Sequence, residues 1–543
     1  MKNGAIRRAS SWAPAAFAIV SAVCAAGAFS RLGLNSLWID ELYTAYFSDP
    51  ALSLGEFFSR ANADVHAPLY YSVIYLIRHA GLDYELTARG FSAVAAVLSL
   101  LGMFLLFRRE LSFNGRLFAC AFAATSATWF NQAQNARSYT LSFLATLGLA
   151  FFSLRLMRAK SDRDFFADLA AFTVMAIVAS FVHYYLVPAA GGFLLYALIA
   201  STTHRRRAAI IASGLAILAV VGGFIAWQRT QHQVSVEDLW FTNSSAHLLN
   251  AGMWTVKAFA GSLYGLAALA LILPLALFPW LQTIRKEKNS FAPLLRDILS
   301  SPAGCLAFAL VFSSVSYLAI SFFITPIISQ RILVPLLPLG WLLAGLAYDG
   351  ATRRANVAPI VALAAAALMT LAGLRTYYRF VPTATEDMRT SAEFVSAHPE
   401  CASGVIPAAF VSSSVNASGV GTFYGYYLPE EFKGALRSVE ATTLPANEAW
   451  NAYAALKARG EDLCPVALWG VHFLTEHTAL TAQARAEAIA EQHGAVAHLV
   501  TFPTTDIPFH GLPFLAPLNH INAAYVILLQ PGDDAPQAAD VDG

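Results

Sequence analysis

The feature that most constrains this chain is a series of apolar runs, each about 17 to 25 residues long. A helix of that length crosses the roughly 30 Å hydrocarbon core of a bilayer. Only 13% of the 543 residues are charged and 57% are hydrophobic, whereas soluble domains carry about 25% charged residues. The sequence therefore predicts an α-helical membrane protein that crosses the bilayer many times.

Eleven of these runs are predicted to be membrane spans. They cover residues 12–32, 87–107, 116–131, 139–157, 166–182, 187–203, 208–227, 262–281, 303–325, 332–348 and 356–375. Arginine and lysine cluster beside every second connection, at residues 7–8, 108–116, 155–163, 205–207, 285–288 and 353–354. Because basic residues collect in cytoplasmic loops, the N-terminus is predicted inside and the region after the last span outside. We favour an uncleaved first span over a cleaved signal peptide.

The first outer loop, residues 33–86, is long enough to carry structure of its own. Residues 68–77 form a Tyr-rich apolar stretch that is too short to span a bilayer, and residues 53–60 form a second short segment. We predict that both are helices lying at the membrane surface. Residues 1–376 are thus interpreted as one membrane domain that includes this loop.

The composition changes after the last span. Helical periodicity is present at 385–397 and 478–493, and short apolar strand-like runs occur at 404–411, 465–473, 497–502 and 523–530. This alternation predicts a small extracytoplasmic α/β domain over residues 377–531. The polar tail, residues 532–543, is predicted to be disordered.

The five cysteines are too few for a disulfide framework. Cys401 and Cys464 both lie in the predicted external domain, where they would either pair or remain free thiols. The other three lie within predicted spans and are interpreted as packing residues. The net charge of +1 gives no indication of a nucleic-acid partner.

Unusual polar residues gather at the predicted outer ends of the spans. They include Asp40, Glu41, Asp64, His66, Arg89, Gln134, Arg137, His183 and Arg331. Singly they have simpler explanations, since an arginine at a span end can reach lipid phosphates and a histidine can belong to an interfacial aromatic belt. Together, carboxylate, imidazole and guanidinium groups on one face predict a site for an anionic ligand, with or without a metal ion.

The order of these residues resembles that of protein O-mannosyltransferase-like membrane glycosyltransferases, and is similar to that of aminoarabinose transferases. Residues 38–43 read W-I-D-E-L-Y and residues 64–71 read D-V-H-A-P-L-Y-Y, like the D-E and D-x-H-P-P-L segments of that family's first loop. Further weak matches follow in order at Arg89, 134–139, 183–185, 330–335 and 386–389. Ala67 and Asn135 depart from the family pattern, which has proline and an acidic residue there.

The resemblance implies the GT-C architecture and an enzyme in a bacterial cytoplasmic (inner) membrane. Such an enzyme moves a sugar from polyprenyl phosphate to an acceptor hydroxyl on the outer face, with inversion. The acceptor class, whether protein, lipid or glycan, stays open. No residue of the chain identifies the sugar.

Glycosyl transfer needs a base at the acceptor hydroxyl and positive charge at the departing phosphate. Asp40 is predicted to be the base, and Glu41 a neighbour that positions it or binds metal. Donor binding is assigned to Arg89, Arg137, Gln134, Arg331, Tyr70 and Tyr184. A divalent metal held by Asp64, His66 and His183 is the alternative to arginines acting alone.

Two other classes compete with this interpretation. A flippase or transporter would show internal repeats and spans broken near the midplane, and the sequence indicates neither. A non-catalytic glycolipid-binding assembly factor would not need an acidic pair beside arginines. The glycosyltransferase is therefore the favoured prediction.

Overall fold

The computed structural model describes most of the chain, with gaps. The described residues are 10–30, 32–34, 36–231, 245–286, 300–329, 331–353, 357–380, 388–410, 423–440, 464–474, 487, 490–491, 495–502 and 521–531. The chain divides into two compact units, which are described separately below. Unit 1 comprises Met1–Leu32 and Phe47–Pro382, and unit 2 comprises Gly33–Tyr46 and Thr383–Gly543.

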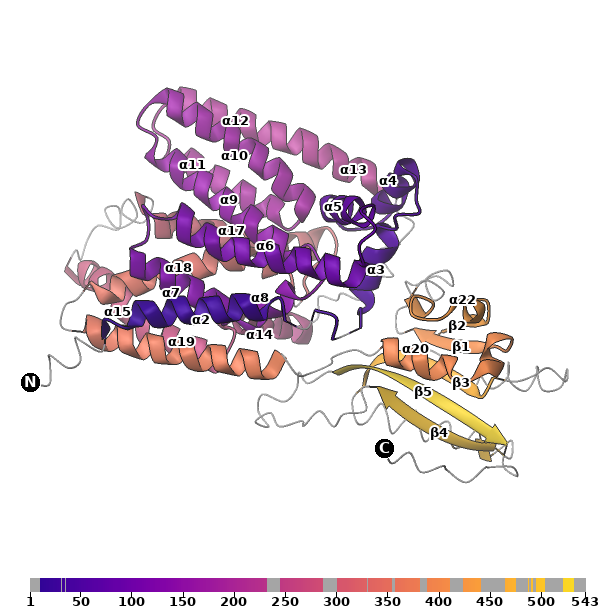
Figure 1. Ribbon diagram of the computed structural model, residues 1–543. Helices are drawn as coiled ribbons and strands as arrows, with labels where there is room; N and C mark the ends of the chain where they lie inside the picture. Colours follow the sequence, from indigo (N-terminus) through magenta and orange to yellow (C-terminus); the bar gives the residue numbers. More distant parts are fainter. Residues whose placement is uncertain are drawn as a thin grey trace, which may run out of the picture. The chain divides into compact units, whose positions relative to one another are not determined.

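Unit 1 is a bundle of helices (Figure 1). Among the described residues, seven of its helices are long and apolar enough to cross a membrane, or eight if one bent pair counts as a single span. They are α6 (Tyr84–Leu106), α9 (Tyr139–Arg158), α10 (Asp162–Val182), α12 to α13 (His204–Arg229), α17 (Pro302–Phe323), η3 with α18 (Val334–Thr352) and α19 (Ala358–Phe380). Shorter helices are α2 (Ala13–Gly27), α7 (Phe113–Ala124), α8 (Ala127–Ala133) and α11 (Leu186–Ala200). The prediction of a multi-spanning helical protein is confirmed, while the count of eleven spans stays a prediction.

The N-terminus of α7 is held by a hydrogen bond to a side chain of another helix. Ser112 ends the loop before α7, and its hydroxyl accepts a hydrogen bond from the Gly115 amide at 3.0 Å. Asp349 of α18 (Leu337–Thr352) accepts in turn from the Ser112 amide at 2.7 Å. A Cβ on Gly115 would lie 2.5 Å from the Asp349 carboxylate. Glycine therefore allows the close contact that satisfies the start of α7.

One sharp bend between two helices bears on the sequence interpretation that no span is broken. Helices α14 (Ser245–Ala260) and α15 (Leu263–Lys286) meet at an 80° bend just before the predicted span 262–281, the geometry of a broken span or of a re-entrant loop. Gly261 lies at the bend with a φ of +68°, a conformation that strongly favours glycine. A Cβ there would lie 2.4 Å from the Cα atom of Ser126. The bend thus lets the chain turn tightly against the start of α8.

Both helices predicted in the first outer loop are present in unit 1. Helix α4 (Leu54–Asn62) begins with a capping box in which Ser53 and Glu56 exchange hydrogen bonds with each other's backbone amides. Helix α5 (Leu69–Arg78) covers the predicted apolar stretch, and buries Tyr70, Tyr71, Ile74 and Tyr75. A third helix, α3 (Ile39–Phe47), was not predicted.

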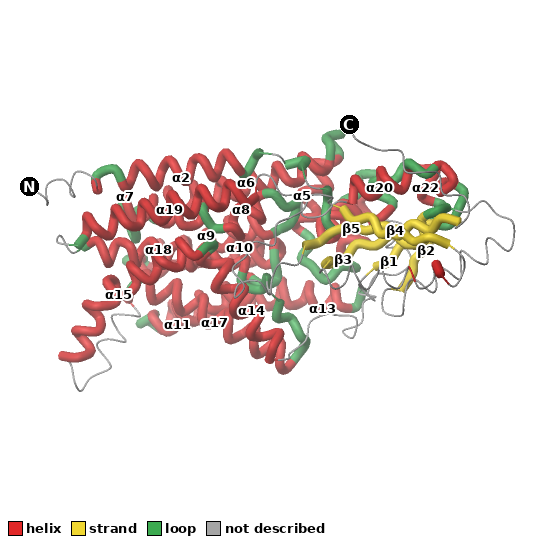
Figure 2. The backbone as a smooth tube through the Cα atoms, turned by 90° about the horizontal axis from the view of Figure 1, so that it is seen from below, coloured by secondary structure: helices red, strands yellow, loops and turns green. Residues whose placement is uncertain are grey.

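Unit 2 contains all the described strands, which are coloured yellow in Figure 2. Its five-stranded sheet has the order β2-β1-β3-β5-β4, with strands β1 (Ile406–Phe410), β2 (Leu436–Glu440), β3 (Val466–Leu474), β4 (Ala495–Phe502) and β5 (Ile521–Pro531). Strands β1, β2 and β3 run parallel, whereas β5 pairs antiparallel with β3 and β4. The four predicted strands are confirmed, and β2 was missed. The predicted helix at 385–397 corresponds to α20 (Met388–Ser396), while most of 478–493 and all of the 532–543 tail lie outside the described residues.

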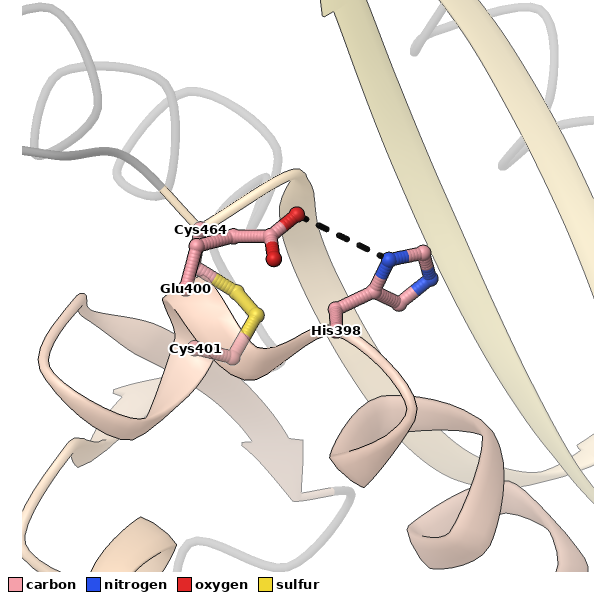
Figure 3. The surroundings of a disulfide bond; sticks show 4 residues. All are labelled: His398, Glu400, Cys401 and Cys464. Atoms are coloured by element: carbon pink, nitrogen blue, oxygen red, sulfur yellow. Dashed lines mark ion pairs between the residues drawn. A yellow bond between two sulfur atoms is a disulfide. The ribbon is translucent and has the colours of Figure 1, made fainter.

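A disulfide joins Cys401 to Cys464 (Figure 3). Cys401 lies in the short helix η4 (Pro399–Ala402), and Cys464 comes just before β3. Of the two alternatives left open by the sequence, the paired one is therefore present. Cys24, Cys120 and Cys305 are buried and free.

The beginning of the first outer loop folds with unit 2. The Met388 amide donates to the Ser36 hydroxyl at 2.8 Å, and the Leu37 amide donates to the Tyr427 hydroxyl at 2.7 Å. The rings of Tyr43 and Phe423 lie 4.4 Å apart. The acidic pair of α3 therefore belongs to unit 2, and the predicted domain boundary near residue 377 does not capture this segment.

Candidate active site

The loop between α4 and α5 presents a carboxylate and an imidazole. Nδ1 of His66 lies 2.9 Å from Oδ2 of Asp64, and the Tyr71 hydroxyl donates to the same oxygen at 2.7 Å. Burial alone would raise the pKa of Asp64, but His66, Tyr71 and Arg137 outweigh burial and hold that pKa well below its usual value. Asp64 is therefore a carboxylate, and burial together with its charge raises the pKa of Tyr71.

Arg137 completes a chain of three residues with this pair. It lies between α8 and α9, is 6% exposed, and its Nη2 is 3.1 Å from Nε2 of His66. A guanidinium can only donate, so Nε2 must accept and the ring proton must sit on Nδ1, facing Asp64. His66 is thus a neutral bridge between a carboxylate and a cation, and its side chain is 44% exposed.

The connection between α10 and α11 adds a second histidine beside the first. The His183 ring lies 5.4 Å from the Tyr139 ring and 4.8 Å from the Tyr185 ring. Burial is the main cause that lowers the pKa of His183 to about 3, and the positive charge of Arg137 adds to it. His183 is therefore neutral in the physiological range and packs as an aromatic residue.

Gln228, at the end of α13 (Gly223–Arg229), was not singled out from the sequence. Its side chain is buried, its Nε2 donates to the carbonyl oxygens of Asp64 and His66, and its Oε1 accepts from the Tyr184 hydroxyl. Its position directly after the predicted span 208–227 was the only sequence feature that could have identified it as a site residue. We define the polar cluster as Asp64, His66, Tyr71, Arg137, His183, Tyr184 and Gln228.

The predicted metal set does not assemble as a metal site. Asp64, His66 and His183 are near one another, but both ring nitrogens of His66 are engaged, one by a carboxylate and one by a guanidinium. Throughout the described part of the chain, no group of three His, Cys, Asp or Glu side chains is arranged to hold a metal ion. The residues as placed do not fit a metal, so no step below passes through one.

Several residues predicted to bind the donor make structural contacts instead of joining the cluster. Arg89 is 3% exposed and donates to the Leu32 carbonyl at 2.7 Å and to Glu85 at 3.2 Å. The Gln134 amide donates to the Ser30 carbonyl at 2.8 Å, at the end of α2. The hydroxyl groups of Tyr70 and Ser92 lie 3.2 Å apart.

Arg331 begins the turn before η3 (Val334–Leu336), where its backbone amide donates to the Ser329 hydroxyl at 3.3 Å. Its neighbour Gln330 lies outside the described residues. The donor-binding roles of Arg89, Gln134, Tyr70 and Arg331 stay predictions, and of the predicted donor-binding residues only Arg137 and Tyr184 lie in the polar cluster.

Asp40 and Glu41 differ in their surroundings although they are adjacent. Both lie in the first turn of α3 in unit 2. Glu41 is fully buried, and its carboxylate accepts from the Trp38 amide at 3.3 Å, half of a capping box. Asp40 is partly exposed. Of the two, Asp40 is the carboxylate that can meet a substrate, whereas Glu41 stabilises the start of its helix.

Chemically, the polar cluster holds a cation in a fixed place. Arg137 is buried and oriented by His66, and guanidinium binds phosphate oxygens through parallel N–H donors. The exposed edge of the cluster is His66. This arrangement suits a singly or doubly charged oxyanion that approaches from the end of the bundle.

Comparisons with known proteins address the fold. No protein-family model and no curated protein matches the sequence. The crystal structure of ArnT from Cupriavidus metallidurans bound to undecaprenyl phosphate is similar over 94% of this chain and 97% of that chain, with a TM-score of 0.50 and 13% identity. Its apo structure covers 96% and 98%, with a TM-score of 0.51 and 12% identity.

A third similar structure is the arabinofuranosyltransferase AftD from Mycobacteria. It covers 94% of this chain and 39% of that one, with a TM-score of 0.47 and 14% identity. At these identities only the fold is shared. The chain has the GT-C fold of membrane glycosyltransferases, and the predicted fold class is confirmed.

Proposed function

We propose that this chain is a membrane glycosyltransferase that moves a sugar from a polyprenyl-phosphate donor to an acceptor hydroxyl. The observation that carries the proposal is the polar cluster, where a buried guanidinium is fixed at one end of a membrane bundle. A lipid-linked phosphate presents its charge at that depth, at the junction of hydrocarbon and water. ArnT, whose fold the chain shares, binds undecaprenyl phosphate, which supports the same donor class here.

In the proposed step the acceptor oxygen attacks the anomeric carbon of the sugar from the face opposite the phosphate. The bond from that carbon to the phosphate oxygen breaks, so the configuration inverts. The acceptor proton passes to Asp40, a base proposed from the sequence resemblance alone. In a separate proposal, which rests on the polar cluster of unit 1, Arg137 balances the negative charge of the departing polyprenyl phosphate.

We place this reaction at the outer face of the cytoplasmic membrane of a bacterium. The ends of α9 and α12 opposite the cluster carry Arg155, Arg158 and the 205–207 arginines, as expected for cytoplasmic ends. A disulfide in unit 2 supports an oxidising compartment for that unit.

A membrane-impermeant maleimide added to intact spheroplasts tests this orientation. Cys401 and Cys464 are expected to react only after treatment with a reductant. Labelling that requires lysis of the cells would reverse the proposed topology.

The activity itself is tested by incubating purified protein with a panel of radiolabelled polyprenyl-phosphate sugars. One donor is expected to be cleaved, with label appearing in an acceptor fraction and free polyprenyl phosphate released. Activity is expected to persist in EDTA, because the cluster as placed does not fit a metal. If no donor of the panel is cleaved, the proposal fails.

The bent α14–α15 pair favours a transporter as the second candidate, because broken spans are common in such proteins. A flippase would move the intact donor between leaflets of a proteoliposome without cleaving it, and a non-catalytic assembly factor would bind it without either effect. The same panel, assayed for both cleavage and leaflet transfer, separates the three classes.

A further inference from the structure

Gln228 joins three segments of unit 1 that are far apart in sequence. Its Nε2 lies 2.9 Å from the Asp64 carbonyl oxygen and 3.2 Å from that of His66, and its Oε1 lies 2.5 Å from the Tyr184 hydroxyl. Carbonyl oxygens only accept hydrogen bonds, so the orientation of the amide is fixed. The residue is 1% exposed, and all of these partners belong to the cluster loops.

The helix that carries Gln228 contains an irregular turn that affects which of its side chains face inward. The span His204–Arg229 contains a π-turn, η1 (Leu218–Gly222), before α13. Since each α-helical residue turns the chain by about 100°, an extra residue in one turn changes which side chain faces inward. Gln228 faces inward, whereas the adjacent Trp227 is 48% exposed. In Figure 1, α13 lies beside α4 and α5 at one end of the bundle.

We propose that Gln228 is a positioning residue for the donor site: its amide holds the Asp64–His66 loop so that His66 keeps Arg137 oriented to bind the donor phosphate. The proposal rests on the proposed function of Arg137. Among the residues that the structure describes, the polar atoms of the Gln228 amide contact the two loop carbonyls and Tyr184. In the proposed role, its effect on Arg137 passes through the loop that carries His66.

The test compares three substitutions by their affinity for undecaprenyl phosphate. Gln228→Leu removes both donors with little change of volume, and Gln228→Glu places a carboxylate against two carbonyl oxygens. Gln231→Glu is the matched control, because Gln231 is exposed and, within the described part of the chain, its amide contacts only Thr230. At pH 8.5 both Gln228 variants are expected to bind about tenfold more weakly than the wild type, and the control within twofold.

A pH comparison separates positioning from general loss of structure. In the Gln228→Glu variant, protonation gives the introduced carboxyl group one O–H donor for a loop carbonyl, and burial favours that protonated form. The affinity ratio of Gln228→Glu to wild type is therefore expected to shrink to about threefold at pH 5.5. Gln228→Leu is expected to keep the same ratio at both pH values. Equal ratios for both variants at both pH values would contradict the proposal.

Hydrogen exchange of the peptides covering residues 60–70 gives a readout that needs no ligand. Exchange is expected to be faster in Gln228→Leu than in the wild type or Gln231→Glu. If Arg137→Ala weakens binding while the Gln228 variants bind normally, the inference fails and the proposed function stands. If the wild type binds no undecaprenyl phosphate, the proposed function fails, and unchanged exchange in Gln228→Leu would then overturn the inference as well.

Discussion

The two ends of the unit 1 bundle hold their charges in different ways. At one end the neutral ring of His66 lies between Asp64 and Arg137. At the other end Arg155 contacts Asp168 directly at 2.7 Å, and Arg158 pairs with Glu110. Helix α9 has 20 residues, so these two groups of charges lie about 30 Å apart along it.

The two arrangements differ in how strongly a carboxylate attracts the positive charge of the arginine. A direct ion pair balances its own charge and ties helices together, as Arg155 of α9 does with Asp168 of α10. A guanidinium that is separated from a carboxylate by an uncharged ring is attracted to that carboxylate more weakly than one in direct contact, because Coulomb attraction falls with distance. We therefore propose that the polar cluster serves ligand binding and that the ion pairs at the other end serve stability.

The largest effect is expected from a substitution of Asp40. In the first turn of α3, as in the bundle, one residue is proposed to function in the reaction and its neighbour stabilises the fold. Asp40→Asn should lower the transfer rate about 10²- to 10⁴-fold, since it removes the proposed base. Glu41→Gln should keep the rate within a few-fold, because an amide oxygen still accepts from the Trp38 amide. Initial rates with the best donor, at equal folded fractions by size-exclusion chromatography, provide the measurement. Similar losses in both variants would remove the distinction between the two residues.

The next largest effect is expected from a substitution of Arg137, which is compared with the same substitution of Arg155. Arg137→Ala should weaken undecaprenyl phosphate binding about 10- to 100-fold, the value of one or two charge-assisted hydrogen bonds. Arg155→Ala should leave that affinity unchanged and lower the melting temperature, because Asp168 is buried and loses its partner. Intrinsic tryptophan fluorescence reports the binding and scanning fluorimetry the melting. Unchanged affinity in Arg137→Ala would contradict the phosphate role.

The sequence was sufficient to predict the parts of this picture that depend on composition and periodicity. Hydropathy predicts the membrane helices, and alternation predicts four of the five strands. His66, Arg137 and His183 were predicted on one face because loop charge defines which span ends belong together.

Contacts between distant segments could not be predicted in this way. Gln228 is 164 residues from Asp64, and nothing in its local pattern separates it from an ordinary polar flank of a span. The same limitation explains why residues 33–46 were assigned to the membrane domain although they belong to unit 2. Arg89 matched a family pattern, yet the structure shows it bonded to the Leu32 carbonyl and Glu85.

The third prediction concerns pH and the neutral state of His183. The pKa of His183 is lowered from 6.5 to about 3 by folding, so below pH 6.5 the unfolded chain binds a proton that the folded chain does not. Stability should therefore fall as the pH decreases from 6.5, by an amount on the order of 2 kcal/mol at pH 5. His183→Gln should remove this part of the decline, whereas His204→Gln, at an exposed site on the basic end, should not. Melting curves at pH 7 and pH 5 test this difference, and parallel declines in wild type and His183→Gln would contradict it.

The smallest effect is expected from a substitution of Glu110. It tests whether the ion pairs at the end opposite the polar cluster contribute to stability and not to ligand binding. The Glu110 side chain is 3% exposed, but its partner Arg158 is 34% exposed, so solvent screens the pair and limits its contribution. Glu110→Gln should therefore cost about 1 kcal/mol of unfolding free energy, measured by denaturant titration in detergent. Undecaprenyl phosphate affinity should stay within twofold of wild type, because no contact of the polar cluster changes. If affinity instead fell tenfold at unchanged stability, the two ends of the bundle would be coupled, and the division between a binding end and a stabilising end would no longer hold.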